Sequence, residues 1–224
     1  AAIEVLEKLA RTHTNLPIVH STLGDTLRRE QLFASAVEAY DRAVSLYGGV
    51  GRSPWFILYA RGISHERLGH WPESEADLRA ALKLNPEQPQ VMNYLGYSLV
   101  EKQANLQEAL GLIKRAVALQ PQSGYIVDSL GWVLFRLGQY TKAVSHMERA
   151  TELMPVDPIV NDHLGDVYWS VGRRLEAEFQ WNRALSFKPE EKDATRIRRK
   201  LEVGLDQVLS EEGAPALELV QDDG

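Results

Sequence analysis

The stretch LGDVYWSVGRRLEAEFQWNRALSFKP, residues 164–189, decides the fold, because its pattern recurs along the chain. A Leu-Gly pair opens the stretch, Ala177 and Ala184 flank the large residue Trp181, and Pro189 closes it. Small residues at helical spacing allow two helices to cross closely, with large side chains filling the space beside them. A proline after the second helix ends it, because proline lacks a backbone N–H and clashes with the preceding turn. The stretch therefore predicts a hairpin of two helices.

The same landmarks return at steps of 34 or 35 residues, which is typical of a helical-repeat protein. The three series are Gly62, Gly96, Gly131 and Gly165; Ala81, Ala116, Ala150 and Ala184; and Pro86, Pro121, Pro155 and Pro189. An earlier copy around Leu23-Gly24 has Gly48 where the proline is expected. The copy around Gly62 departs most, with Arg61, His65 and Ser74 in slots that are apolar or Ala elsewhere.

These copies predict how the chain is divided. The expected segments are 1–16, the second helix of an incomplete preceding repeat; 17–54, the first repeat with a glycine-rich insertion loop; 55–88, 89–123, 124–157 and 158–191, four further repeats; 192–209, a capping helix; and 210–224, an acidic flexible tail.

Local signals predict individual helix ends and close contacts. Asp157-Pro158 and Ser53-Pro54 each indicate an N-cap residue followed by a proline in the first helical turn. A large residue in place of Gly131 or Ala150 is expected to wedge its hairpin open.

Composition excludes several classes of function. The net charge of −6 provides no basic field for a phosphate backbone, so no nucleic-acid partner is expected. The chain has no cysteine, which excludes thiol nucleophiles and cysteine metal sites but leaves the compartment open. Its apolar runs are far shorter than the ~20 residues of a membrane helix, so no direct membrane insertion is expected. The chain opens without Met, and we expect the native protein to continue N-terminally.

Catalytic motifs are missing from the sequence. Gly48-Gly49-Val50-Gly51 lacks the Gly-Lys-Ser/Thr ending of a phosphate loop, and the six histidines never form a pair at i, i+4. We therefore expect no enzyme activity, no cofactor and no metal site.

The Leu-Gly, Ala, Ala and Pro slots together resemble the tetratricopeptide-repeat family. This resemblance implies an all-α fold, a right-handed superhelical solenoid of helix-turn-helix repeats, whose concave face binds a protein or peptide partner. The groove-facing slots of the family are occupied here by Asn93, Tyr94, Tyr97, Asp128, Trp132, Phe135, Asp162, His163, Asp166 and Trp169. Aromatic and amide side chains suit the recognition of an extended or helical peptide. The alternative interpretation is that Trp132 and Trp169 pack between neighbouring helices as core.

Residues 93–185 carry a more particular resemblance through the motifs Asp128-Ser129-Leu130-Gly131-Trp132 and His163-Leu164-Gly165. They are similar to the C-terminal portion of exported proteobacterial repeat proteins, often lipoproteins. One branch of that group is an adaptor that brings a carboxyl-terminal processing protease to cell-wall hydrolases. The resemblance implies a periplasmic or outer-membrane-associated location, with the cytoplasm as the alternative.

Two hypotheses of function follow. The first is a scaffold or adaptor that binds a protein or peptide through the concave face, recruiting a periplasmic processing protease or its substrates. The second is a structural module that self-associates into a homodimer or filament through the ends of the array.

Overall fold

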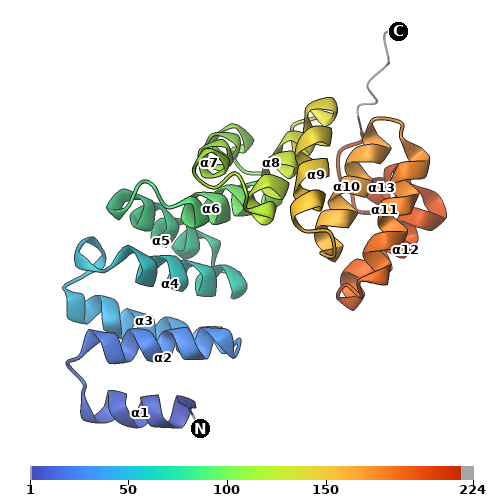
Figure 1. The fold of residues 1–224 in the computed structure, drawn as a ribbon. Helices are drawn as coiled ribbons and strands as arrows, with labels where there is room; N and C mark the ends of the chain where they lie inside the picture. Colours follow the sequence, from blue (N-terminus) through green and yellow to red (C-terminus); the bar gives the residue numbers. More distant parts are fainter. Residues whose placement is uncertain (1, 218–224) are drawn as a thin grey trace. The chain divides into compact units, whose positions relative to one another are not determined.

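The computed structural model describes residues 2–217 (Figure 1), and within them every regular element is helical. The all-α prediction is therefore confirmed. The helices are α1 (Ala2–Thr12), α2 (Pro17–Arg29), α3 (Phe33–Tyr47), the short 3-10 helix η1 (Val50–Arg52), α4 (Trp55–Arg67), α5 (Trp71–Leu84), α6 (Pro89–Glu101), α7 (Leu106–Leu119), α8 (Gly124–Arg136), α9 (Tyr140–Leu153), α10 (Pro158–Ser170), α11 (Arg174–Ser186), α12 (Glu191–Val203) and α13 (Leu205–Glu211).

These helices divide into two compact units, residues 1–91 and residues 92–224. In the first unit, α1 to α5 pack in chain order, each helix against the next (Figure 1). In the second unit, α7 to α13 also pack in chain order. The fully buried side chains include Tyr40 and Leu58 in the first unit and Ile113, Met147 and Trp181 in the second.

The Leu-Gly slots mark places where the two helices of a hairpin come unusually close. A Cβ atom at Gly131 would lie 2.8 Å from Cγ of Met147, and one at Gly96 would lie 2.7 Å from Cγ1 of Ile113. Both distances are shorter than a normal contact, so only glycine fits unless the opposing side chain shifts. The structure thus gives the physical reason for the glycine series.

The irregular second repeat contains a buried ion pair where the other repeats are apolar. Nε and Nη2 of Arg61 each donate to the carboxylate of Asp77 at 2.7 Å, and Nη1 donates to Asp41 at 2.6 Å. The Asp77 side chain is only 6% exposed, so Arg61 neutralises a carboxylate that burial would otherwise destabilise. Arg61 thus differs from the apolar residue of the other repeats, but its charge is neutralised. Helices α4 and α5 still pack against each other as the two helices of a hairpin.

One of the two predicted N-caps is present. Oδ1 of Asp157 accepts from the backbone N–H groups of Ile159 and Val160 at 2.9 and 3.1 Å, as the Asp-Pro signal predicts. The Ser53 prediction is wrong, because its hydroxyl donates to the carbonyl oxygen of Gly49 at 3.0 Å and does not cap α4. Ser53 is instead bonded back into the insertion loop.

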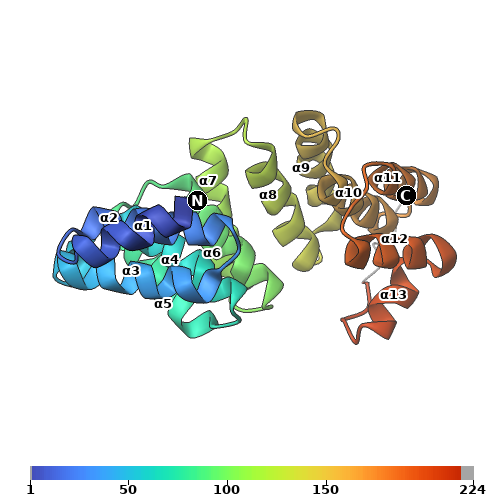
Figure 2. The same cartoon turned by 90° about the horizontal axis from the view of Figure 1, so that it is seen from below.

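The C-terminal end differs from the single capping helix that was expected over 192–209. Gly204 has φ of +84°, which ends α12 and starts α13 at an angle to it (Figure 2). A Cβ atom at 204 would overlap the indole ring of Trp169, so this turn is also tightly packed. Ser210 and Glu211, which were expected to open an acidic tail over 210–224, belong to α13, and residues 212–217 have no regular secondary structure. Residues 218–224 lie outside the described part of the chain.

Candidate functional site

A groove of about 470 Å³ lies in the second unit, beside the C-terminal end of α8. We call it the α8 groove. Its helical lining comes from α6, α8, α12 and α13, together with the starts of α7 and α9. The lining residues are Glu101, Gln103, Leu106, Trp132, Phe135, Arg136, Tyr140, Arg196, Leu209 and residues 212–217. The lining combines aromatic rings with both signs of charge, which suits a partly apolar peptide.

Trp132 is both a wall of the α8 groove and part of the packing behind it. Its Nε1–H donates to Oε1 of Glu101 at 2.9 Å, and its ring stacks on His163 with centroids 4.1 Å apart and on Phe135 at 4.9 Å. Only 8% of the residue is exposed. The two interpretations of Trp132 are thus not exclusive, since the ring packs on its neighbours and the residue also lines the groove.

Behind Trp132, His163 forms a buried ion pair with Asp128. Nδ1 of His163 lies 3.0 and 3.1 Å from the two carboxylate oxygens. Burial by itself would lower the pKa of His163, but the carboxylate of Asp128 overcomes that effect, and the pKa is raised above 6.5. The pair fixes the ring on which Trp132 stacks.

Asp162 and Asp166 are neutralised from within the chain. Nζ of Lys200 on α12 donates to Asp162 at 2.7 and 2.9 Å and to Asp166 at 2.6 Å, and Lys200 is only 1% exposed. Trp181 also donates its Nε1–H to Asp166 at 2.9 Å. Burial raises the pKa of Asp162, while the ammonium group of Lys200 acts in the opposite direction. The structure therefore places these two carboxylates in a network that binds α12 to α10.

Trp169 is covered from the C-terminal side. Its Nε1–H donates to Asp206 at 2.7 Å, the guanidinium of Arg174 lies 3.6 Å from its ring centroid, and the turn at Gly204 packs on it. This cation–π arrangement leaves the ring partly exposed. Trp169 is not among the residues that line the α8 groove.

The three predicted residues of α6 lie apart from the lining of the groove. Tyr97 is half-buried, and burial raises its pKa. Tyr94 is likewise half-buried. Asn93 is 8% exposed, and its Oδ1 atom makes no hydrogen bond within the part of the chain that the structure describes.

Of the ten predicted site residues, the structure places Trp132 and Phe135 in the groove and brings His163 and Asp128 directly behind it. Sequence reasoning missed Glu101, Arg136 and Arg196, because charged residues on helices are normally solvated. It also missed residues 212–217, whose composition indicates a frayed tail. The spacing of Arg196 and Lys200, one helical turn apart and opposite two aspartates, is the signal that could have indicated this face of α12.

Among residues 2–217, no helix is long and apolar enough to cross a membrane. The same described residues contain no group of three or more His, Asp or Glu side chains that could hold a metal ion.

Comparison with known proteins agrees with the repeat pattern. A family model described as Tetratricopeptide repeat matches residues 59–124 and 129–191, more than half of the chain. TPR repeat-containing protein PA4667 of Pseudomonas aeruginosa is 32% identical over 91 residues, which are 41% of this chain and 15% of that protein. BBSome complex member BBS4 of Bos taurus is 26% identical over 117 residues, 50% of this chain and 21% of that protein. The matched part of the chain thus spans about a fifth or less of these relatives.

Solved structures show the same fold. YrrB, described as a TPR protein with an unusual peptide-binding site, aligns with a TM-score of 0.64 at 21% identity, covering 88% of this chain and 99% of that one. A chain of the APC/C hetero-tetramer Cut9-Hcn1 aligns with a TM-score of 0.75 at 18% identity, covering 91% of this chain and 39% of that one. Proteins of this fold generally mediate protein–protein interactions and are typically non-enzymatic. The chain belongs to the tetratricopeptide-repeat family, as its helix pairs, its glycine and alanine series and the family match together show.

Proposed function

We propose that this chain is a non-enzymatic adaptor that binds a peptide segment of a protein partner in the α8 groove. The observation that carries the proposal is the lining of the groove, in which Trp132, Phe135 and Tyr140 provide apolar area and Glu101, Arg136 and Arg196 provide polar contacts. Aromatic and arginine side chains in a concave site are the residue types that dominate binding energy at protein interfaces.

The groove is also rigidly supported. Trp132 is fixed by its hydrogen bond to Glu101 and by stacking on His163, which is itself held by Asp128. A preorganised wall loses little conformational entropy when a ligand binds. Asp128 and His163 therefore have positioning roles in this proposal, while Asp162 and Asp166 hold α12 in place.

For the partner, we propose a periplasmic processing protease or one of its substrates. The support is the resemblance of residues 93–185 to exported adaptor proteins, together with the match to the Pseudomonas aeruginosa repeat protein. The identity of the partner does not affect where on the chain it binds.

A second candidate function is self-association through the first helix. Val5 and Leu9 of α1 are 59% and 38% exposed, an apolar face that a second copy of the chain could cover. Light scattering across a concentration series tests it, since a concentration-independent monomer would remove this candidate.

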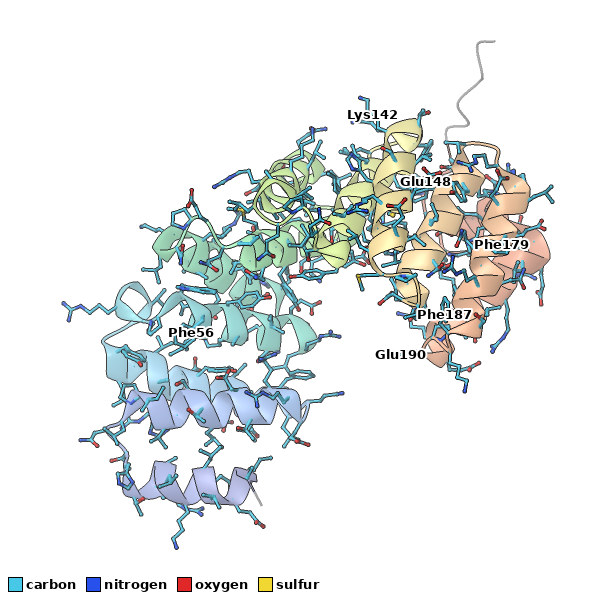
Figure 3. The ribbon with its side chains drawn as sticks, in the orientation of Figure 1. Phe56, Lys142, Glu148, Phe179, Phe187 and Glu190 are labelled. Carbon is cyan, nitrogen blue, oxygen red and sulfur yellow. The ribbon has the colours of Figure 1, made fainter. Side chains whose placement is uncertain are left out.

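The groove proposal is tested with defined ligands. Peptides are selected from a random display library on the wild-type chain, and their affinities are then measured by calorimetry against Arg136→Glu and Lys142→Glu. Both variants change the charge by the same amount, but Arg136 lines the groove whereas Lys142 points into solvent at the start of α9 (Figure 3).

We expect Arg136→Glu to weaken the selected peptides at least about tenfold, as loss of an interface arginine typically does, and Lys142→Glu to leave them unchanged. Equal affinities for the two variants, or a library that yields no binder, would argue against the groove.

A further inference from the structure

The chain's own residues 214–217 line the α8 groove without belonging to any of its helices. After α13 ends at Glu211, Gly213 adopts φ of +67° and turns the chain, and the N–H of Ala214 donates to the carbonyl oxygen of Leu209 at 2.9 Å. This helix ending directs the following residues back along the groove. The segment Ala214-Pro215-Ala216-Leu217 is therefore positioned by a specific turn.

The side chains of this segment are unequally buried. Ala214 and Leu217 are half-buried, whereas Pro215 and Ala216 are exposed. The segment has no regular secondary structure, and residues 215–217 make no hydrogen bond to another backbone group within the described part of the chain. The segment thus meets the groove with two half-buried side chains, at its first and fourth positions, and its proline limits the freedom of its backbone.

Two sets of ion pairs hold the segment near the groove. Arg196 donates to both carboxylate oxygens of Glu212 at 2.7 and 3.2 Å, and Arg199 donates to Glu211 at 2.7 and 3.2 Å. Leu205 and Val208 of α13 are buried beneath them. Tethering at such short range gives the segment a high effective concentration at its own groove.

We propose that residues 214–217 are an internal ligand of the α8 groove, and that a partner binds by displacing them with an extended segment of the same chemistry. That chemistry is a small residue, a proline and, three positions after the small residue, a large aliphatic side chain in the place of Leu217. The inference rests on the proposed function, because it takes the α8 groove to be the partner site. Affinity for a partner is consequently lowered by the chain itself.

The test uses the whole 224-residue chain and a fluorescein-labelled peptide with the sequence of residues 213–217, Gly-Ala-Pro-Ala-Leu. Fluorescence anisotropy gives its affinity for the wild type, for Leu217→Gly and for Ala216→Gly. Both substitutions add the same backbone flexibility, but only Leu217→Gly removes a half-buried side chain. For an effective concentration of about 1 mM and a peptide Kd of about 100 µM, vacating the groove strengthens apparent binding about tenfold.

We expect this gain for Leu217→Gly alone, and we expect Arg136→Glu added to Leu217→Gly to abolish it. Equal peptide affinity in the wild type and Leu217→Gly, or no binding to either protein, would overturn the inference. If peptides from the display library still bind the wild type through Arg136 in that case, the proposed function stands and only the internal ligand is lost. If Arg136→Glu also leaves the affinity of those peptides unchanged, the groove itself is not the partner site.

Discussion

Gly165 on α10 lies directly beneath the indole ring of Trp181 on α11, so that a Cβ atom at 165 would overlap Cδ1 and Nε1 of that ring. Trp181 is fully buried and donates its Nε1–H to Asp166, so it has no room to withdraw. This contact joins α10 to α11. Through Trp181 and Asp166 it also connects Gly165 to the ion-pair network of Lys200 on α12.

Substitution of this glycine therefore tests the hairpin geometry. We expect Gly165→Ala to lower the free energy of unfolding by about 1–3 kcal/mol, because the added methyl group overpacks the crossing. Gly111 on α7 is the matched control, since it is exposed and a Cβ atom there meets nothing within 4 Å. Gly111→Ala should stabilise the chain by about 0.5–1 kcal/mol through helix propensity. Urea denaturation followed by circular dichroism measures both, and a neutral Gly165→Ala would refute the close crossing.

Lys200 gives a test of the buried network. We expect Lys200→Met to destabilise the second unit by about 3–5 kcal/mol, because Asp162 and Asp166 lose their buried cation. Lys192→Met removes an exposed lysine from the same helix and should change stability by less than about 0.5 kcal/mol. Thermal unfolding of the two variants compares them directly. Similar melting temperatures would mean that the network contributes no net stability.

His163 predicts a pH dependence of stability. Its pKa is raised in the folded chain, so the protonated form stabilises the fold fully below pH 6.5, and this contribution is lost as the pH rises through the folded-state pKa. Each unit of pKa shift corresponds to about 1.4 kcal/mol. We expect wild-type stability to fall as the pH rises above 6.5, and His163→Gln to flatten that fall. The control is His13→Gln, which changes an exposed histidine and should leave the dependence of stability on pH as in the wild type. If His163→Gln also leaves that dependence unchanged, the ion pair between His163 and Asp128 is not its cause.

Arg61 and Asp77 provide a double-mutant cycle in the first unit. Arg61→Leu restores the residue of the repeat pattern but strands a buried carboxylate, so we expect a loss of about 3–5 kcal/mol. Arg61→Leu combined with Asp77→Leu removes both charges and should recover most of that loss. Urea denaturation of Arg61→Leu, of Asp77→Leu and of the double variant gives the coupling energy between the two side chains. Additive effects of the two substitutions would show that the pair is not coupled.

The sequence predicts the helical architecture well because short-range chemistry determines it. Gly131 and Ala150 act on the helix that contains them or on the helix opposite, and Pro155 acts on the helix that it follows. Residues such as Lys200 escape that reasoning, since its partner Asp162 lies on another helix 38 residues away and the repeat period does not indicate which cation faces which carboxylate. Ser53 escaped it for a local reason, because the hydroxyl had a competing acceptor in Gly49.

The candidate site shows the same division. Trp132 and Phe135 could be placed on the groove from their slots in the repeat. The part of the groove made by residues 212–217 depends on the break at Gly204, and that break depends on packing against Trp169. Composition assigns this segment to solvent, because it lies within the stretch 210–224 that is acidic as a whole.

Site-specific photo-crosslinking shows directly whether a bound peptide lies in the α8 groove. Benzoylphenylalanine is placed at Gln103, an exposed residue of the groove lining, and at Gln107, an exposed residue of α7 outside the lining. The two proteins are irradiated with the peptides selected from the display library. We expect a crosslinked product from position 103 and none from position 107. Products of equal yield from both positions, or a product from 107 alone, would show that the peptides bind elsewhere.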